Sequence, residues 1–571
     1  MDRILVLNLT RMGDILQSAP LISGLKARHP RAELGLLVQK AFASTAQLVP
    51  QVDRVLTLDQ DQAVAMLMEE RLPLGRQAQW FQEQVRDLRG EGWDLVINLS
   101  HSRDSAVLAR LLGRGEVRGL VLEPSGRMGV SHDWARYFFC VTGNRAVNQL
   151  NLVDIYRRLG DLEGGEGTME LRVGDMAQAG VDAQAEAFPG KGALVLVQAG
   201  ASRPNRRWPL DRMAGVMRDL HARAACRFAL TGSGGESALC QELAALVPDL
   251  PVLNLSGGTS VAELGAWCRR ADLLITNDTG TLHVAAATGL SSVSLFIATA
   301  LPWETAPWLP GCLVLHADMD CAPCSHHVVC PHVQCRDRIA LESVRDAALL
   351  LLARRGLASA PAADWAGRSG VRVYETFRDK EGWLDLMEHG ARELDIATHT
   401  GRAFRHLWFR RLGVAVSEGG GLRHGGNGDR AHLKVALGGL LERLETLRGE
   451  ALRASRLVKE IHAELMGRGA RAKRLDGMAR RLTEMDDGLF ELELGQPLLR
   501  PLGVLHRMAK DELQGITDMQ ALGRATAACY AELGERCGEL AGLLVEGPRR
   551  SVPHGVARPE AQERTEACAS L

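Results

Sequence analysis

Residues 273–287 read LLITNDTGTLHVAAA. The apolar run Leu273–Asn277 predicts a buried strand, a small polar turn follows it, and the small residues from Thr281 to Thr288 predict a helix. A buried strand that leads directly into a helix is the repeating unit of a parallel sheet covered by helices. The stretch therefore indicates an α/β fold, and the rest of the chain can be compared with it.

The same alternation recurs along two parts of the chain, separated by a Gly/Glu-rich interruption at 160–167. Further strands are expected at Ile4–Asn8, Glu33–Val38, Val55–Leu58, Asp94–Leu99, Ala193–Gln198, Arg227–Thr231, Val252–Asn254 and Val293–Phe296. Helices are expected at Asp14–Arg28, Leu74–Arg89, Ser105–Leu112, Asp211–Ala224, Glu236–Leu246 and Val261–Arg269. We therefore expect two doubly wound, Rossmann-like domains, residues 1–170 and 190–355, facing a cleft. Ligands of such open sheets bind beyond the carboxyl ends of the strands.

Beyond residue 356 the sequence no longer alternates between strand and helix patterns. An Ala/Pro/Ser-rich segment, Leu357–Asp364, predicts a linker, and long helical patterns such as Leu433–Leu465 follow. Strand signals are almost absent there, so residues 365–547 are expected to form a mostly helical appendage. The polar, Pro-bearing end, residues 548–571, is expected to be a disordered tail.

Composition narrows the class of protein. The 571 residues are 46% hydrophobic and 24% charged, which is typical of a soluble globular chain. A formal net charge of −1 gives no basic field for nucleic acid. Ile4–Leu7 is too short for the apolar region of an export signal, and no run of about 18 apolar residues exists. We therefore expect a cytoplasmic protein with reduced thiols.

The first candidate motif is the glycine turn at 8–16, NLTRMGDIL, which places Asp14 in the first turn of a helix. Backbone N–H groups at a helix start favour a negative side chain or ligand. Asp14 therefore either belongs to a functional turn at this helix start or is simply an N-cap or first-turn residue of its own helix.

Two further motifs follow predicted strands of the second domain. Arg206 and Arg207, in NRRWP, lie on a loop where they could neutralise a diphosphate, or they are a solvated charge pair. The turn TGSGGE at 231–236 lacks the Walker ending, and its Glu236 is either a partner for ribose hydroxyls or part of a plain βα turn.

The turn in residues 277–283 contains several groups that could bind an anion or a sugar. The N–H groups of Thr279 and Gly280 would point outward at a helix N-terminus, where an anion is favoured. Asp278 could bind sugar hydroxyls, and His283, one turn further on, could donate to phosphate. The alternative is a capped helix with a satisfied histidine.

A cysteine segment lies at 321–335, with His326, His327 and His332 between the thiols. Its spacing is not that of a common zinc finger, but four thiols this close are compatible with a structural zinc ion. Reduced thiols or a labile disulfide are the other interpretations. The residues concerned are Cys321, Cys324, Cys330 and Cys335.

Together and in this order, these motifs resemble glycosyltransferase family 9, the heptosyltransferases of lipopolysaccharide synthesis. The resemblance covers roughly residues 1–350. It depends on the opening TRMGD, the RRWP sequence, the DTGxxH turn and the cysteine segment, and the turns around Asp14 and Asp278 are its more specific parts.

The resemblance implies a GT-B fold, inversion at the anomeric carbon, ADP-heptose as co-substrate and no required metal. It implies that Asp14 is the general base and that Asp278, Thr279, Gly280 and His283 contact the donor. Arg206 stands where the family usually has a lysine facing the donor phosphates, and Arg207 follows it. Glu236 falls near a ribose-binding acidic position, although the glycine pattern around it differs.

The implied acceptor is the lipid A–core of lipopolysaccharide, which would bring the enzyme to the inner face of the cytoplasmic membrane as a peripheral protein. Arg103, Arg127 and Arg136 are candidate acceptor-binding residues, with surface solvation as the alternative for each. Two other functions stay open: a transferase of the same fold with another donor or acceptor, and a degenerate transferase that serves as a scaffold through its helical region.

Overall fold

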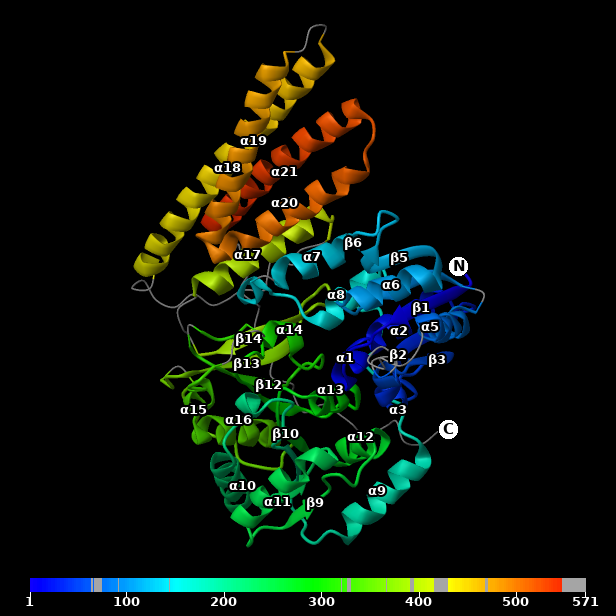
Figure 1. The fold of residues 1–571 in the computed structure, drawn as a ribbon. Helices are drawn as coiled ribbons and strands as arrows, with labels where there is room; N and C mark the ends of the chain where they lie inside the picture. The colour runs from blue at the N-terminus through cyan, green and yellow to red at the C-terminus, as the bar shows by residue number, and fades with distance from the viewer. Residues whose placement is uncertain are drawn as a thin grey trace.

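The computed structural model describes residues 1–62, 65, 74–90, 92–142, 144–319, 321–325, 330–365, 367–390, 395–414, 430–467 and 471–546. Two α/β sheets lie one beyond the other, and a bundle of long helices projects from the outer side of the first (Figure 1). The expected tail at 548–571 lies outside the described residues.

The first sheet has the strand order β3-β2-β1-β4-β5-β6. Its strands are β1 Arg3–Leu7, β2 Glu33–Gln39, β3 Arg54–Leu58, β4 Trp93–Asn98, β5 Gly113–Leu122 and β6 Met128–Ser131. All neighbours pair in parallel except the last, because β6 returns beside β5 as a hairpin. Its helices are α1 Met12–Gln17, α2 Ala19–Arg28, α3 Ala43–Ala46, α5 Leu74–Arg89, α6 Arg103–Leu112, α7 Asp133–Thr142 and α8 Leu152–Leu159.

The second sheet has the order β14-β13-β12-β11-β10-β7-β8-β9. Its parallel strands are β7 Leu194–Gln198, β8 Arg227–Leu230, β9 Val252–Asn254, β10 Leu273–Asn277, β11 Ser292–Phe296 and β12 Leu313–Ala317. Its helices are α9 Asp175–Ala187, α10 Leu210–Ala224, α11 Ser237–Leu246, α12 Val261–Arg270, α13 Gly280–Ala287, α14 Pro302–Thr305, α15 Cys335–Arg338 and α16 Leu341–Arg354. Strands β7 and β10 are buried at every position, which explains their continuous apolar runs.

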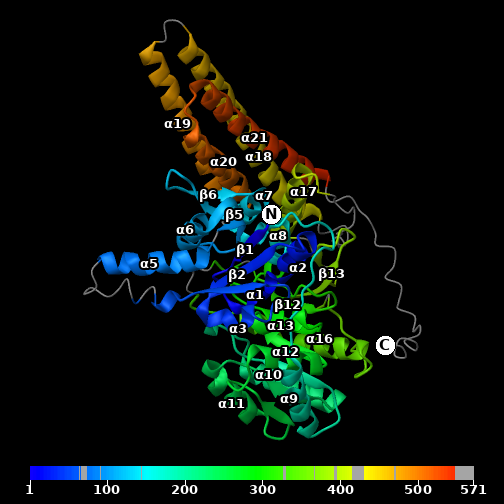
Figure 2. The same ribbon diagram turned by 90° about the vertical axis from the view of Figure 1, so that its right-hand side faces the viewer.

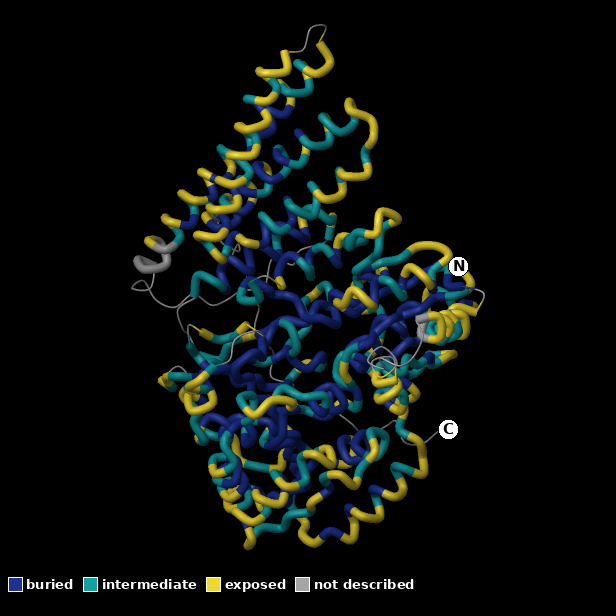
Figure 3. The backbone as a smooth tube through the Cα atoms, in the orientation of Figure 1, coloured by how far each residue is buried: buried dark blue, intermediate teal, exposed yellow. Residues whose placement is uncertain are grey.

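Both sheets follow the doubly wound order in which the chain reverses direction beside its first strand. The reversal lies between β1 and β4 in the first sheet and between β7 and β10 in the second. The expected α/β, GT-B-type fold class is confirmed by these two sheets. Figure 3 shows the strands as buried centres beneath a more exposed helical surface.

The sequence analysis was wrong about residues 371–389, which it assigned to the helical appendage. They form β13 Val371–Arg378 and β14 Leu384–His389, an antiparallel hairpin added to the edge of the second sheet. Their burial does not follow a strict period of two, because Asp385 is buried together with its neighbours Leu384 and Leu386, whereas Met387 is exposed. Register is set instead by pairing with β12, for example Leu315 beside Val373.

The expected helix Asp14–Arg28 is divided into α1 and α2 at Ser18. Pro20 has no N–H to donate to the carbonyl group of Leu16, so the hydrogen-bond ladder is interrupted there. The break leaves α1 as a short helix, Met12–Gln17, separate from α2.

The remaining helices form the bundle at the top of Figure 1: α17 Ile396–Arg411, α18 Arg430–Met466, α19 Ala472–Leu494, α20 Arg500–Glu512 and α21 Met519–Glu546. Helices α18 and α21 pack along one another through residues spaced three and four apart. The α18 side of this contact consists of Leu440, Leu444, Leu447, Ala451, Ala454 and Val458. Among the described residues, no helix has the length and apolarity needed to cross a membrane.

A buried ion network joins the bundle to both sheets. Asp385 of β14 accepts a bidentate pair of hydrogen bonds from Arg402 of α17 at 2.6 and 2.7 Å, and a third from Arg405 at 2.9 Å. Arg405 also donates to the carbonyl oxygen of Gln149 in the first unit, at 3.4 Å. Burial would raise the pKa of Asp385, but the two guanidinium groups lower it overall. Helix α17 therefore connects β14, at the edge of the second sheet, to the loop of the first unit that contains Gln149.

Candidate functional site

The chemistry-bearing motifs lie at the two chain reversals, where the sheets face one another. Asp14 follows β1, Arg206 follows β7, and Asp278 follows β10. Helices α1 and α13, which begin directly after β1 and β10, contact each other in the centre of the molecule (Figure 1). The structure therefore brings together residues that are up to 270 positions apart in the sequence.

Two glycines allow this close approach. A Cβ atom on Gly13 would lie 2.9 Å from Cδ2 of His283 and 3.4 Å from Cα of Gly280. A Cβ atom on Gly280 would lie 3.5 Å from the backbone nitrogen of Gly13. The first turns of α1 and α13 thus touch almost backbone to backbone, with no room for a larger residue at Gly13.

Asp14 is half-buried in the first turn of α1. Its Oδ2 accepts a hydrogen bond from the backbone N–H of Arg11 at 3.2 Å, while the Asn8 amide donates to its carbonyl oxygen at 3.0 Å. Asp14 does cap its own helix, as the simpler interpretation held. Its charge also acts across the interface, because it opposes the effect of burial on the pKa of His283.

Asn277 holds the second unit's loops in register. This fully buried amide donates to the carbonyl oxygens of Ala199 and Gly200, at 2.8 and 3.1 Å. Its oxygen accepts from the N–H of Trp208 at 3.1 Å. The loop after β7 is therefore fixed against the turn after β10, because one side chain bonds to both ends of the loop.

Arg206 and Asp278 form an ion pair across these two loops. Nη2 of Arg206 donates to a carboxylate oxygen of Asp278 and, at 3.1 Å, to its carbonyl oxygen. Burial raises the pKa of Asp278, with Arg206 and then Arg145 acting against that rise. Nε of Arg206 is buried and has no hydrogen-bond partner among the described residues.

A second ion pair, which the sequence analysis missed, connects the two units at the same place. Arg145, in the short helix η2 Arg145–Val147, donates to Oε2 of Glu304 from Nε at 2.7 Å and from Nη2 at 2.6 Å. Its Nη1 donates to the carbonyl oxygen of Thr299 at 2.8 Å. Burial raises the pKa of Glu304 against the attraction of Arg145, and the charges of Asp278 and Asp14 add to the rise. No local pattern marks either residue, because each lies in a short helix, η2 or α14, outside the strand–turn–helix motifs.

His283 lies in α13, 4% exposed, beside the first turn of α1. Burial lowers its pKa to about 4, although Asp14 acts in the opposite direction. The imidazole is therefore neutral near pH 7. Its Nδ1 has no hydrogen-bond partner within the described part of the chain. Tyr156 of α8 is buried close by, where burial and then the charges of Asp14 and Glu304 raise its pKa.

Two predicted donor residues are engaged in local structure. Oε2 of Glu236 accepts from the backbone N–H and the hydroxyl group of Ser233, at 2.8 and 2.9 Å, so Glu236 caps the short helix η4 Gly234–Glu236. Arg207 donates to the carbonyl oxygen of Ala201 at 3.1 and 3.2 Å. Both stand beside the site, but each has a structural task that explains its position.

The expected acceptor arginines separate. Arg127 donates to the carbonyl oxygen of Asp511, and Arg136 pairs with Glu512, each at 2.5 Å. Both therefore contact the bundle helix α20, and their role in acceptor binding stays a prediction. Arg103 is exposed at the start of α6, beyond the carboxyl end of β4.

The cysteine segment lies against the loop that follows β11. The N–H of Cys324 donates to the carbonyl oxygen of Ala298 at 2.8 Å. Burial raises the pKa of Cys324, and the thiols of Cys321, Cys335 and Cys330 add to this, so the four sulfur atoms are neighbours. All four are free thiols, and within the described ranges no three His, Cys, Asp or Glu side chains are placed to hold a metal. The described residues thus include no ligand set for the zinc ion considered from the sequence, and His326 and His327 lie outside them.

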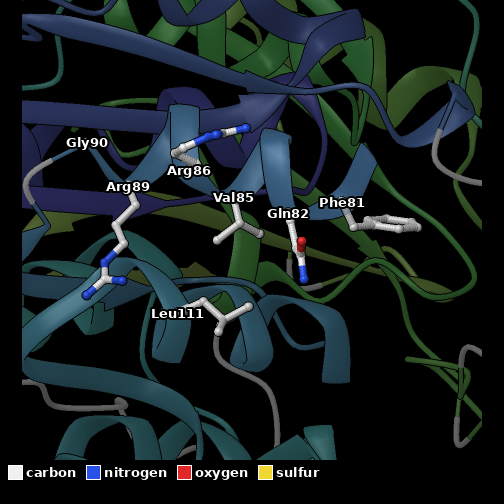
Figure 4. A pocket seen from close by; sticks show the side chains of 7 residues that line it. All are labelled: Phe81, Gln82, Val85, Arg86, Arg89, Gly90 and Leu111. Atoms are coloured by element: carbon white, nitrogen blue, oxygen red, sulfur yellow. The ribbon is translucent and has the colours of Figure 1, made fainter. Parts of the chain in front are cut away.

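Figure 4 shows a separate hollow of about 500 Å³ between α5 and the end of α6. Helix α5 extends sideways from the first sheet in Figure 2. The hollow is lined by residues that precede β4 and β5, so it opens at the amino edge of the sheet, away from the motifs. Its lining residues are Phe81, Gln82, Val85, Arg86, Arg89, Gly90 and Leu111.

Comparison with known proteins agrees with this geometry. The model of glycosyltransferase family 9 (heptosyltransferase) matches residues 82–331. Lipopolysaccharide heptosyltransferase 3 of Escherichia coli is 25% identical over 315 residues, which is 52% of this chain and 83% of that protein. Lipopolysaccharide heptosyltransferase 1 of Pseudomonas aeruginosa is 25% identical over 329 residues, 56% of this chain and 86% of that protein.

Among solved structures, a family 9 glycosyltransferase from Veillonella parvula matches 62% of this chain and 98% of its own, with 19% identity and a TM-score of 0.49. The ADP-heptose lipopolysaccharide heptosyltransferase II of E. coli matches 62% of this chain and all of its own, with 19% identity and a TM-score of 0.45.

Proposed function

The chain belongs to glycosyltransferase family 9, and on that premise we propose that it transfers heptose from ADP-heptose to the inner core of lipopolysaccharide. That it is a glycosyltransferase follows from the family; the donor and the acceptor are our proposal. The observation that carries it is the contact between α1 and α13, which places Asp14 of one unit beside the donor-type turn of the other.

Asp14 acts as the general base in this proposal. An acceptor hydroxyl group is a poor nucleophile and must lose its proton as it attacks the anomeric carbon. A half-buried carboxylate at the carboxyl end of β1 can accept that proton, since only one of its oxygens is engaged, by a 3.2 Å hydrogen bond.

The departing nucleoside diphosphate gains negative charge as the glycosidic bond breaks. Arg206, the start of α13 and the ring N–H of the neutral His283 are the groups we propose to stabilise it. With the base on the first unit and these donors on the second, attack and departure take place on opposite faces of the sugar, which gives inversion. We propose that these protein groups make a metal ion unnecessary for the transfer.

The acceptor side is proposed to be the first unit, with Arg103, Arg127 and Arg136 as its candidate arginines. A lipid-anchored acceptor would hold the enzyme at the cytoplasmic face of the inner membrane as a peripheral protein. Glu236 and Arg207 are proposed to support the donor through the loops that they stabilise.

The test is turnover of ADP-heptose with a panel of truncated lipopolysaccharide acceptors, followed by ADP release and product mass. Asp14→Asn keeps the size of the side chain and removes its basicity, so the rate should fall about 10²–10⁴-fold. Glu163→Gln, in the exposed loop after α8, is the matched carboxylate control and should leave the rate unchanged. Transfer of heptose by Asp14→Asn at the wild-type rate would remove Asp14 from the mechanism.

Transfer from a different nucleotide sugar is the second candidate function, because no residue of the described turns identifies which sugar is bound. It predicts that ADP-heptose is not consumed while another nucleotide sugar is. A scaffold function is favoured by one observation: Arg127 and Arg136 anchor the helical bundle on the first unit. It predicts that the protein turns over no nucleotide sugar while still binding a partner through the bundle.

A further inference from the structure

Two arginines, one from each unit, form ion pairs near the contact between the units, and the proposed chemistry so far uses only one of them. Arg145 comes from the first unit and Arg206 from the second. Both act on the pKa of Asp278 as attractive charges, so both guanidinium groups are within electrostatic reach of the turn after β10. We propose that Arg145 is the second diphosphate-binding residue of the site and, with Arg206, grips the diphosphate from the side of the first unit. This inference rests on the proposed function.

Arg145 is held ready for a further ligand. Its guanidinium group has five N–H bonds, of which one from Nε and one from Nη2 go to Glu304 and one from Nη1 goes to Thr299. Among the described residues, two N–H bonds, one on each Nη, have no acceptor. Glu304 fixes the plane of the group through two hydrogen bonds, so little conformational entropy is lost when an anion binds.

Arg206 is arranged in the same way. Asp278 engages its Nη2 from one side, while its buried Nε has no partner among the described residues. Nδ1 of His283 is a second buried nitrogen at this interface that has no partner in the described part of the chain. Buried polar groups in proteins are nearly always hydrogen-bonded, so unsatisfied nitrogens beside two arginines indicate the place of a ligand rich in acceptor oxygens.

Charge and access agree with this assignment. The side chains of Arg145, Glu304 and Arg206 are 14%, 16% and 15% exposed, so each is reachable but mostly withdrawn from bulk water. Each arginine is paired with one carboxylate, so a bound diphosphate would be held by the N–H groups that these carboxylates leave open. A planar fork on either side matches the geometry of phosphate oxygens better than a single lysine would.

The alternative role for Arg145 is a mechanical link, since its partners Glu304 and Thr299 belong to the second unit. The two roles differ in what they do to ligand binding. A link that only holds the units together would affect AMP and ADP alike. Loss of a residue that binds the diphosphate would weaken the binding of ADP and inorganic pyrophosphate far more than the binding of AMP.

The experiment is calorimetric titration of the full-length protein with ADP, AMP and inorganic pyrophosphate. Arg145→Ala should weaken ADP and pyrophosphate about 10–100-fold, the worth of a bidentate charge-assisted contact, and change AMP less than threefold. Arg145→Lys should restore part of the loss, because it returns the charge without the fork. Arg354→Ala, which removes an arginine of equal geometry from its pair with Glu375 elsewhere on the second sheet, should change none of the three.

The inference would be overturned if Arg145→Ala weakened the binding of AMP and ADP equally, or weakened neither. It would also be overturned if the wild-type protein bound neither pyrophosphate nor any of ADP, UDP and GDP. Thermal unfolding of each variant separates loss of binding from loss of fold. The proposed function is tested independently by product mass. Heptose transfer by Arg145→Ala at the wild-type rate refutes this inference alone, whereas Arg145-dependent pyrophosphate binding without any heptose transfer refutes the proposed function alone.

Discussion

Replacement of Gly13 by alanine tests whether the contact between α1 and α13 is the working arrangement of the site. The added Cβ would lie 2.9 Å from Cδ2 of His283, whereas ordinary van der Waals contact is 3.4–4 Å. His283 is only 4% exposed and cannot turn out into solvent. The two helix starts must therefore separate by roughly 0.5–1 Å, because dense packing leaves no other space.

A shift of this size matters more for catalysis than for stability. Misplacement of reacting groups by about 1 Å costs on the order of 10²-fold in rate. Alanine is favoured over glycine within a helix by roughly 0.5–1 kcal/mol, which offsets part of the steric cost. We therefore expect kcat/KM to fall 10–100-fold while the free energy of unfolding, measured in urea, changes by less than about 1.5 kcal/mol.

Gly180→Ala is the matched control. Gly180 lies within helix α9, and nothing lies within 4 Å of its added Cβ. This variant should gain about 0.5–1 kcal/mol of stability and keep its kcat/KM. A Gly13→Ala protein that folds and turns over at the wild-type rate would show that α1 and α13 do not stay in contact during the reaction, and the reasoning about Asp14 and His283 would fail.

The remaining predictions concern stability. Asp385→Asn should lower the free energy of unfolding by about 3–5 kcal/mol in urea, because it leaves the buried guanidinium group of Arg402 without its carboxylate and removes one of the two carboxylates that Arg405 contacts. His283 has a folded-state pKa of about 4, below its unfolded value of about 6.5, so its contribution is present above pH 6.5 and is lost as pH falls toward 4. Between pH 7 and pH 5 this amounts to about 2 kcal/mol, and His283→Asn should lose correspondingly less stability than the wild type over that interval. Deletion of residues 395–546 should abolish cooperative unfolding by circular dichroism, since it strips Asp385 of its partners and uncovers Trp134 and Trp383.

The first of these predictions has a control variant, and each has a result that would contradict it. Glu450→Gln breaks an exposed pair on α18 and should cost less than about 0.5 kcal/mol, so an equal cost for Asp385→Asn would contradict its burial. An unchanged pH profile in His283→Asn would mean that this histidine is already charged or free in the native protein. A deletion protein that unfolds cooperatively and still binds ADP would show that the bundle is a separable unit.

Much of the fold was readable from the sequence. Buried parallel strands must be apolar along their whole length, and the helix that follows must start with a turn, so the strand–turn–helix units were visible residue by residue. The same local rule placed Asp14, Arg206 and Asp278 at the carboxyl ends of strands, where the doubly wound order brings them to the reversals. These predictions depend on neighbours within a few positions, and the sequence contains that information directly.

Other features depend on partners far along the chain. The hairpin of β13 and β14 forms because β12 offers it an edge and α17 covers it, and neither condition is visible in residues 371–389 themselves. The contacts of Arg127 and Arg136 with α20 could not be predicted either, because their partners Asp511 and Glu512 lie nearly 400 positions away in the sequence.

The sequence by itself determined the strand-and-helix alternation, the two Rossmann-like units and the carboxylate and arginine at the strand ends, since each follows from hydrophobic periodicity and local turn chemistry. Only the tertiary structure decided that Arg145 meets Glu304 and Thr299, that Gly13 touches His283, and that a buried Asp385 ties the helical bundle to the catalytic units. The physical reason is that an ion pair or a close contact is a property of two surfaces, and its energy depends on the burial and distance that folding sets, which no single stretch of sequence specifies.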